Sequence, residues 1–384
     1  MRNNNVLMQF SKHLSRLDWP LFIAALALSG AGLAVLYSLS VVSGDFLQFE
    51  KQLLFVVVGA LAVLLLSAFD FRIFKNRSGA VLLVYGISVV LLAALFIFGV
   101  KVRGTAAWLQ VGSFGFQSVE VTKLAIVILL AKYFSARHKE SYRFLHIIIS
   151  GMYVALPAVF VLLQPDFGSA LTLALLWFGI VAFSGIKIKH LIILFLIAVI
   201  VSASAWFFFF KPYQKERILS FFDPTSDPSG ASYNIIQSLA AVATGSWFGK
   251  GYLQGTQGSL GFLPEAKTDF IFSAFVEEFG FAGAAVLFIV FLFFLWRILR
   301  VGQQASNNFA RIFCSGFFIL ILVHIVINIS MNLNMLPVVG IPLPLVSYGG
   351  SHLITIFLGV AIVQSIRVHT LHKSIGAHDF IAYG

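Results

Sequence analysis

Charged residues are scarce in this chain: Asp, Glu, Lys and Arg make up only 11% of its 384 residues, whereas hydrophobic residues make up 59% and the mean hydropathy is +0.95. A soluble domain of this composition would expose large apolar patches and aggregate. The composition therefore excludes a soluble globular protein and indicates a membrane protein. Cysteine is scarcer still, because Cys314 is the only one. This excludes a disulfide framework or a cysteine-based metal site within one chain.

Uninterrupted apolar stretches dominate the sequence. A helix that crosses a membrane needs about 20 apolar residues, and we count ten such stretches, at 19–42, 52–69, 79–100, 118–134, 145–163, 168–184, 190–210, 270–296, 311–336 and 350–366. We therefore predict an all-α, polytopic integral membrane protein of about ten transmembrane helices, with residues 1–384 forming a single membrane domain. The first stretch follows a basic start and lacks an A-x-A cleavage site, so we interpret it as a signal-anchor helix.

The positions of the basic residues predict the orientation of the chain in the membrane. The formal charge of +11 could suggest a nucleic-acid partner, but Lys and Arg concentrate in alternate loops. If both termini lie on one side, the loops and tails of that side hold 17 Lys and Arg, and the opposite loops hold eight. Because loops rich in Lys and Arg stay in the cytoplasm, this asymmetry predicts that both termini are cytoplasmic. We predict no nucleic-acid partner.

One outer loop, at about 211–269, is far longer than the others and precedes the eighth helix. Such a loop in a compact protein is usually functional or disordered, but its aromatic residues and the amphipathic segment SYNIIQSLAAVAT, which ends before Gly245, indicate a folded cap at the outer membrane surface. The loop also contains a glycine-rich tract. Its spacing does not fit a phosphate loop, because only three residues separate Gly245 from Gly249 and a glycine follows Lys250.

Two ionisable residues lie at the edge of an apolar stretch in QSVEVTKLAIVILLAKYF, which begins at Gln117. Glu120 and Lys123 are three residues apart, so they share one helix face. Ionisable groups inside a membrane usually face a cavity or each other. The pattern therefore predicts either a substrate-binding pair or an internal ion pair that fixes helix packing, and the two interpretations are compatible.

The segment QPDFGSA separates two apolar stretches, because Pro165 interrupts the helix. Gln164 and Asp166 are therefore expected at a tight outer turn. The spacing favours a simple turn in which the aspartate bonds its own backbone. Both residues remain candidates for the substrate site.

A proline-rich segment, LPVVGIPLPLVSYGGSHLI, begins at Leu336. Its prolines forbid a continuous helix, and non-helical backbone at membrane depth must be buried in protein or line a cavity. The last helix then opens with small residues: Ser347, Gly349, Gly350 and Ser351. A helix N-terminus of this kind suits an anion, although a kinked joint is the alternative. Asn328 and Asn332 on the preceding helix are expected to form interhelical hydrogen bonds.

Charge also gathers in PEAKTDFIF, at residues 264–272. We place Asp269 in the first turn of the eighth helix, where the helix dipole alone could explain an acid. That does not explain Glu277 and Glu278, which lie one to two turns deeper. From the helical angles we expect Glu277 to line the same cavity and Glu278 to contact a neighbouring helix. Together these features predict a site for an amphipathic, anionic substrate with a polar part outside the bilayer.

Long segments of the chain resemble the SEDS family of shape, elongation, division and sporulation proteins, above all RILSFFDPTSDPSGASYNIIQS, GYLQGTQGSLGFLPEAKTDFIFSAFVEEFGFAG and LPVVGIPLPLVSYGGS. The resemblance implies a ten-helix peptidoglycan glycosyltransferase that polymerises lipid II during cell elongation and shape maintenance. It would work in the bacterial cytoplasmic (inner) membrane with a class B penicillin-binding protein and other membrane proteins of the elongation machinery. A lipid II flippase, or a non-catalytic scaffold that activates a penicillin-binding protein, are the alternatives.

The resemblance also implies roles for single residues. The family's essential acid corresponds to Asp269, the candidate general base, and its intramembrane pair corresponds to Glu120 and Lys123. Lys123, Lys267 and Arg217 are candidates for binding the diphosphate of the substrate, with a divalent cation (Mg²⁺ or Mn²⁺) as a possible cofactor. The chain departs from the common family pattern at Ala107, at Ser118 and Val119, and at Lys267. Since lysine is normally charged, the last departure argues against proton shuttling at that position.

Overall fold

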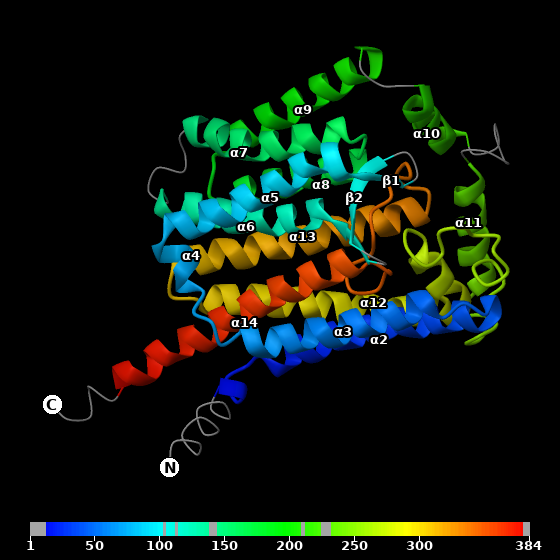
Figure 1. Ribbon diagram of the computed structural model, residues 1–384, viewed down its shortest axis with the longest axis horizontal. Helices are drawn as coiled ribbons and strands as arrows, with labels where there is room; N and C mark the ends of the chain where they lie inside the picture. Colours follow the sequence, from blue (N-terminus) through cyan, green and yellow to red (C-terminus); the bar gives the residue numbers. More distant parts are fainter. Residues whose placement is uncertain are drawn as a thin grey trace.

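The structure is a computed structural model that describes residues 13–102, 105–111, 114–137, 144–208, 212–223 and 232–378. In these residues the chain forms a bundle of long helices with one small sheet at its side (Figure 1). Three shorter helices accompany the long ones, namely α4 (Arg72–Asn76), α10 (Pro212–Phe222) and α11 (Tyr233–Gly245).

Every apolar stretch predicted from the sequence is helical. The long helices are α2 (Trp19–Ser43), α3 (Leu47–Leu66), α5 (Ser78–Phe98), α6 (Ser118–Ala136), α7 (Phe144–Leu163), α8 (Phe167–Phe183), α9 (Ile188–Phe208), α12 (Ile271–Gln304), α13 (Asn308–Asn332) and α14 (Gly350–His378). In the described part of the chain, seven are long and apolar enough to cross a membrane: α2, α3, α5, α7, α12, α13 and α14. Segments of α8 and α9 are apolar but shorter, and α6 contains three charged residues. The chain is a multi-pass helical membrane protein, as predicted.

A three-stranded antiparallel sheet follows α5, and the sequence analysis did not predict it. Its strands are β1 (Val100–Val102), β2 (Thr105–Val111) and β3 (Phe114–Gln117), in the order β1-β2-β3. Trp108 pairs with Gln117, directly before α6 begins. The sheet therefore sets the position of the first turn of α6.

The centre of the bundle is formed by α6 and α13. Nearly all side chains of α6 are buried, polar ones included. It packs against α5 and α13, while α13 also packs against α8 and α12, and α14 packs against α3. Since water is absent from such a core, each polar group on α6 needs a partner within the protein.

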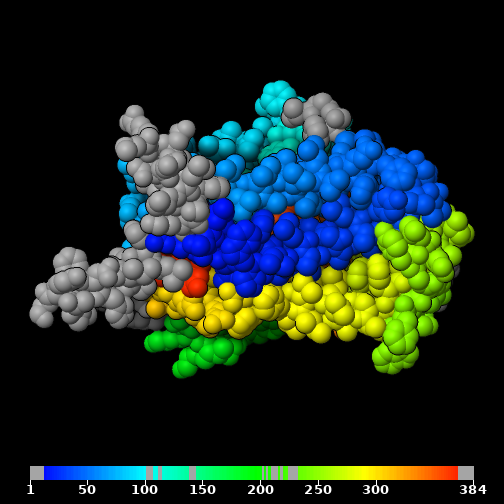
Figure 2. Space-filling view, turned by 90° about the horizontal axis from the view of Figure 1, so that it is seen from below, coloured from blue at the N-terminus to red at the C-terminus, as the bar shows by residue number. Residues whose placement is uncertain are grey.

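The two ends of the bundle differ in what they carry. In Figure 1, α2 begins and α14 ends on the left, whereas α10 and α11 lie on the right, which we call the loop end. Figure 2 shows the yellow-green residues that follow α11 projecting from the loop end. Because α11 packs against α12, the expected folded cap is confirmed for residues 232–269. Residues 209–211 and 224–231 of the predicted loop lie outside the described residues.

The cap is joined to α12 where that helix breaks. Gly280 has a φ of 68° and interrupts the helical geometry, so neighbouring backbone groups lose their helical partners. The loop of residues 246–251 replaces those partners. Its four hydrogen bonds are Lys250 N to Glu277 O, Gly251 N to Glu278 O, Phe281 N to Ser246 O and Ala282 N to Trp247 O. The break is therefore a fully bonded junction between cap and helix.

Replacing Gly280 should separate cap from helix. A Cβ atom at this position would collide with the backbone of Trp247 and Gly249, and its positive φ disfavours any other residue. We expect Gly280→Ala to lower the free energy of unfolding by about 2 kcal/mol or more, measured as thermal unfolding in detergent. Gly30→Ala is the control, because open space surrounds that position. Equal stability of both variants would contradict this account of the junction.

Candidate functional site

A cavity of about 330 Å³ lies at the loop end, within the size range of small-molecule sites. Its wall combines the sheet, α11, the segment before α12, the proline-rich segment and the start of α14. The lining residues are Trp108, Gln117, Asp166, Asn234, Glu265, Thr268, Asp269, Phe270, Val338, Val339, Gly340, Pro342, Tyr348, Gly349, Ser351 and His352. The cavity therefore gathers segments that are distant in the sequence, the turn at Asp166 among them.

Asp269 lies on the cavity wall, but it does not lie in the first turn of α12, as the sequence analysis placed it. The helix begins at Ile271, and Phe270 occupies the N-cap position without a side-chain cap hydrogen bond. The N–H group of Ser273, which an N-cap side chain usually binds, instead donates to Oδ1 of Asn332, 3.1 Å away. Helix capping therefore does not account for Asp269.

Two hydrogen bonds from the segment before α14 hold the backbone next to Asp269. The N–H group of Tyr348 donates to the carbonyl of Lys267 at 2.9 Å, and Oγ of Ser347 donates to the carbonyl of Thr268 at 2.6 Å. Ser347 is buried and also accepts from the N–H group of Leu343 at 2.8 Å. Ser347, which the sequence predicted as part of an anion site, is thus a backbone clamp in the structure.

The carbonyl of Asp269 is held by two asparagines of α13. The Nδ2 atoms of Asn328 and Asn332 each donate to it at 2.9 Å. The predicted interhelical hydrogen bond is confirmed for Asn332, whose Oδ1 accepts from Ser273 of α12. Asn328 instead binds the segments before α12 and α14. Three consecutive carbonyls, those of residues 267–269, are bound by other segments. Asp269 is consequently presented to the cavity on an immobilised backbone.

The start of α14 is less open to an anion than the sequence suggests. The N–H group of Gly349 donates to Oε1 of Gln52, 3.2 Å away. Gly349 lines the cavity, but Gly350 is a packing residue, since a Cβ there would collide with the ring of Phe55. In this structure the N–H group of Gly349 is therefore already bound, and Gly350 packs against α3. Burial raises the pKa of the neighbouring Tyr348, so its hydroxyl stays neutral and can donate a hydrogen bond.

Glu120 and Lys123 form the predicted ion pair inside the bundle. Lys123 Nζ lies 2.8 Å from Oε1 of Glu120, and both side chains are buried. Lys123 Nζ also lies 3.2 Å from Nε2 of His324. Neither member of the pair is among the residues that line the cavity. The direct contact between Lys123 and a substrate that the sequence predicted is therefore not available in this structure.

His352 connects this pair to the cavity, and the sequence analysis missed it. Its Nδ1 lies 2.8 Å from Oε2 of Glu120, and its ring stacks on that of His324 with centroids 4.7 Å apart. His352 lines the cavity. Because 232 residues separate His352 from Glu120, no local pattern could predict their contact. The one signal in the sequence for a site residue is that His352 lies in the first turn of the last helix.

Gln164 and Asp166 occupy the expected turn but have different surroundings. Oδ1 of Asp166 accepts from the N–H group of Ser169 at 3.0 Å and caps α8, which confirms the turn interpretation. Asp166 also lines the cavity. Gln164 is buried and donates to the carbonyl of Leu92 at 3.0 Å, so its role in the structure is to join α5 to this turn.

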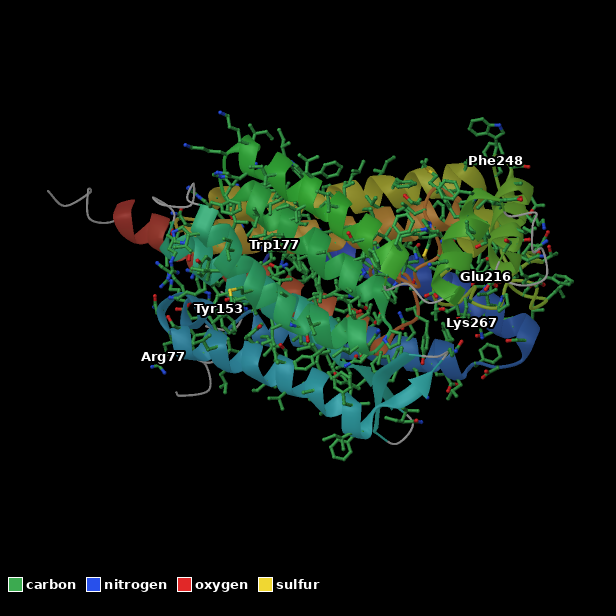
Figure 3. The ribbon with its side chains drawn as sticks, turned by 90° about the horizontal axis from the view of Figure 1, so that it is seen from above. Arg77, Tyr153, Trp177, Glu216, Phe248 and Lys267 are labelled. Carbon is green, nitrogen blue, oxygen red and sulfur yellow. The ribbon has the colours of Figure 1, made fainter. Side chains whose placement is uncertain are left out.

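The remaining predicted cations are not placed on the cavity wall. Lys267 and Glu216 of α10 both lie at the loop end, whereas Arg77 lies at the other end of the bundle (Figure 3). It is partly exposed, and only its backbone takes part in the clamp. Arg217 belongs to α10, but its side chain lies outside the described residues.

Glu277 does not line the cavity, contrary to the prediction. Its carboxylate binds the cap through Lys250 Nζ at 2.6 Å and through the N–H groups of Thr256 and Gln257 at 2.9 and 3.1 Å. Glu278 contacts a neighbouring helix, as predicted, by accepting a hydrogen bond from Ser38 of α2. These two acids hold the cap and the bundle together and do not form part of the site.

The geometry defines a class of protein: a multi-pass membrane protein whose loop end carries a polar, substrate-sized cavity walled by carboxylates. The chain belongs to the FtsW/RodA/SpoVE family, described as cell cycle proteins, whose family model matches residues 19–372.

Relatives with known names cover almost the whole chain. The peptidoglycan glycosyltransferase MrdB of Escherichia coli (strain K12) is 33% identical over 361 residues, which cover 94% of this chain and 96% of MrdB. The peptidoglycan glycosyltransferase RodA of Treponema pallidum is 29% identical and covers 93% of this chain and 99% of its own length.

Solved structures share the fold. One is a chain of a peptidoglycan synthase complex that coordinates polymerisation and crosslinking, with a TM-score of 0.78, 28% identity and coverage of 92% of this chain and 98% of that chain. Another is the rod shape-determining protein RodA of Thermus thermophilus, with a TM-score of 0.66, 26% identity and coverage of 91% and 96%.

The buried ion pair allows a test of stability. Lys123→Met leaves Glu120 buried without its ammonium partner, so we expect the free energy of unfolding to fall by about 3–5 kcal/mol. Adding Glu120→Gln to Lys123→Met removes the uncompensated charge and should recover most of that loss. Thermal unfolding in detergent measures both effects.

Lys132→Met provides the matched control for this test. Lys132 lies on the same helix, and its ammonium binds the carbonyl of Lys75 at an exposed site, so we expect a loss of about 1 kcal/mol at most. A double variant no more stable than Lys123→Met would show that the pair does not hold α6 in this way.

Proposed function

We propose that this chain is a peptidoglycan glycosyltransferase that polymerises lipid II into glycan strands during cell elongation, with Asp269 as the general base. The observation that carries this proposal is the position of Asp269. It lies on a cavity wall, its backbone is held at three carbonyls, and capping of α12 does not explain it.

The reaction requires an acceptor sugar hydroxyl to attack the anomeric carbon of a donor. The hydroxyl is a poor nucleophile until a base accepts its proton, and the carboxylate of Asp269 takes that proton. The new glycosidic C–O bond forms as the bond between the anomeric carbon and the diphosphate oxygen breaks, and undecaprenyl diphosphate leaves with the electron pair. Positioning and charge stabilisation supply the catalysis, and no covalent enzyme intermediate is required.

The leaving diphosphate requires positive charge, and three carboxylates share the cavity wall: Asp166, Glu265 and Asp269. Carboxylate oxygens suit Mg²⁺ or Mn²⁺, which bind proteins through one or two carboxylates together with phosphate oxygens. We propose Asp166 and Glu265 as the residues that hold such an ion. When bound, it would neutralise charge on the diphosphate. Lys267, which does not line the cavity, and Arg217 are proposed to attract the anionic substrate.

We further propose that the loop end faces the outside of the bacterial cytoplasmic membrane and that both termini are cytoplasmic. The excess of Lys and Arg in the opposite loops supports this orientation. A class B penicillin-binding protein, which crosslinks glycan strands, is the proposed partner, together with other membrane proteins of the elongation machinery. The likeness to a chain of a peptidoglycan synthase complex supports such a partner.

Asp269→Asn tests the assignment of the general base. The amide keeps the shape of the side chain but cannot accept the proton, so we expect polymerisation of lipid II by the purified protein to fall by about 100-fold or more. Binding of lipid II should remain near that of the unchanged protein, because a negative charge is removed from the site. Thermal stability should also be unchanged.

Asp45→Asn is the matched control, since Asp45 is an exposed acid after α2 whose Oδ1 accepts from the N–H group of Leu47 at 3.0 Å, a hydrogen bond that the amide oxygen of Asn can also accept. Near-normal polymerisation by Asp269→Asn would exclude Asp269 as the base. If the unchanged protein moved lipid II between leaflets without forming glycan, a flippase would be the better assignment. If it did neither and only stimulated a penicillin-binding protein, it would be a scaffold.

A further inference from the structure

Among the described residues, no group satisfies one ring nitrogen of His352. Its side chain is only 4% exposed, and no hydrogen-bond partner lies near Nε2. Its Nδ1 is bound by Glu120 at 2.8 Å. Buried polar atoms nearly always have a partner, and this one belongs to a residue on the cavity wall. The free nitrogen therefore indicates a ligand in the cavity.

The hydrogen bonds around His352 define which atoms carry protons. An ammonium group only donates, so Nε2 of His324 accepts from Lys123 and its Nδ1–H faces the carbonyl of Pro342 at 3.4 Å. His324 is therefore neutral. The carboxylate of Glu120 only accepts, so Nδ1 of His352 carries a proton.

The same geometry decides against a bound metal at this cluster. Glu120, His324 and His352 bring three ligand atoms within 4.8 Å of one another. The ammonium of Lys123, however, already contacts both Glu120 and His324. A positive charge thus occupies the place of a cation, and a second cation would be repelled.

The charge of the cavity wall is one-sided. Among the described residues that line it, Asp166, Glu265 and Asp269 carry carboxylates, none is Lys or Arg, and His352 is the basic side chain. The cation proposed at Asp166 and Glu265 would offset part of that negative charge, and His352 offers the diphosphate a hydrogen-bonding group of the protein itself. In the described part of the chain, Nε2 of His352 has no competing partner.

We infer that His352 is a substrate-contacting residue whose Nε2–H donates a hydrogen bond to an oxygen of the leaving lipid diphosphate. This inference rests on the proposed glycosyl transfer. As the bond from the anomeric carbon to the diphosphate oxygen breaks, the electron pair moves onto the diphosphate, and the Nε2–H group of His352 stabilises it without giving up its proton. Glu120 and Lys123 are positioning residues in this arrangement, because they reach the substrate only through the ring of His352.

The test measures binding of undecaprenyl diphosphate to the purified full-length protein, together with kcat/KM for lipid II polymerisation. His352→Asn retains a donor near Nδ1 for Glu120 but lacks the group at Nε2. We expect it to bind undecaprenyl diphosphate at least about tenfold more weakly and to lose at least about tenfold in kcat/KM, with unchanged thermal stability. His352→Gln, which retains a neutral donor farther along the side chain, should recover part of the binding.

His369→Gln is the matched control, because His369 lies on the same helix beyond the cavity and binds the carbonyl of Ser365. It should bind undecaprenyl diphosphate like the unchanged protein. Unchanged affinity and unchanged kcat/KM in a stably folded His352→Asn protein would overturn the inference. Failure of the unchanged protein to polymerise lipid II would instead overturn the proposed function, and the binding measurement separates the two outcomes.

Discussion

The hydrogen bonds to the carbonyls of residues 267–269 determine the geometry of the cavity. They come from the start of α14 and from α13, two segments distant in sequence from the residues that they hold. Each bonded carbonyl would be left unsatisfied if the segment moved, and buried backbone groups without partners are costly. The clamp therefore limits the freedom of Asp269 before any substrate arrives. Such preorganisation lets a charged group act without reorganising during the reaction.

The same need for internal partners explains where the other buried charges lie. Glu277 and the broken turn at Gly280 are satisfied by the cap, so the acids deep in α12 hold the loop end together. Glu120 and Lys123 satisfy each other in the core. The second oxygen of Glu120 then orients His352, and in this way a buried pair acts at the cavity wall without lining it.

The helices were predictable because membrane-spanning helices need long apolar stretches, and the chain has little else. The turn at Asp166 was also predictable, since Pro165 interrupts the helix and aspartate is a good N-cap. The sheet was not, because its strands are only three, seven and four residues long. The prediction for Glu277 was wrong for two reasons. It measured the helical angle from Asp269, which precedes α12. A helical angle also cannot show that the cap folds back onto the face of α12 that carries Glu277.

The amino-acid sequence by itself determined the class of protein, the long helices and the family, and it singled out Asp269 as a candidate site residue. Each of these depends on the length of apolar stretches or on contiguous motifs. The tertiary structure alone decided which side chains meet. It placed Lys123, Ser347 and Gly350 off the cavity wall and brought His352 to Glu120 across 232 residues. The reason is physical: hydrogen bonds and ion pairs between distant helices follow from how the bundle packs, and no local pattern in the chain encodes them.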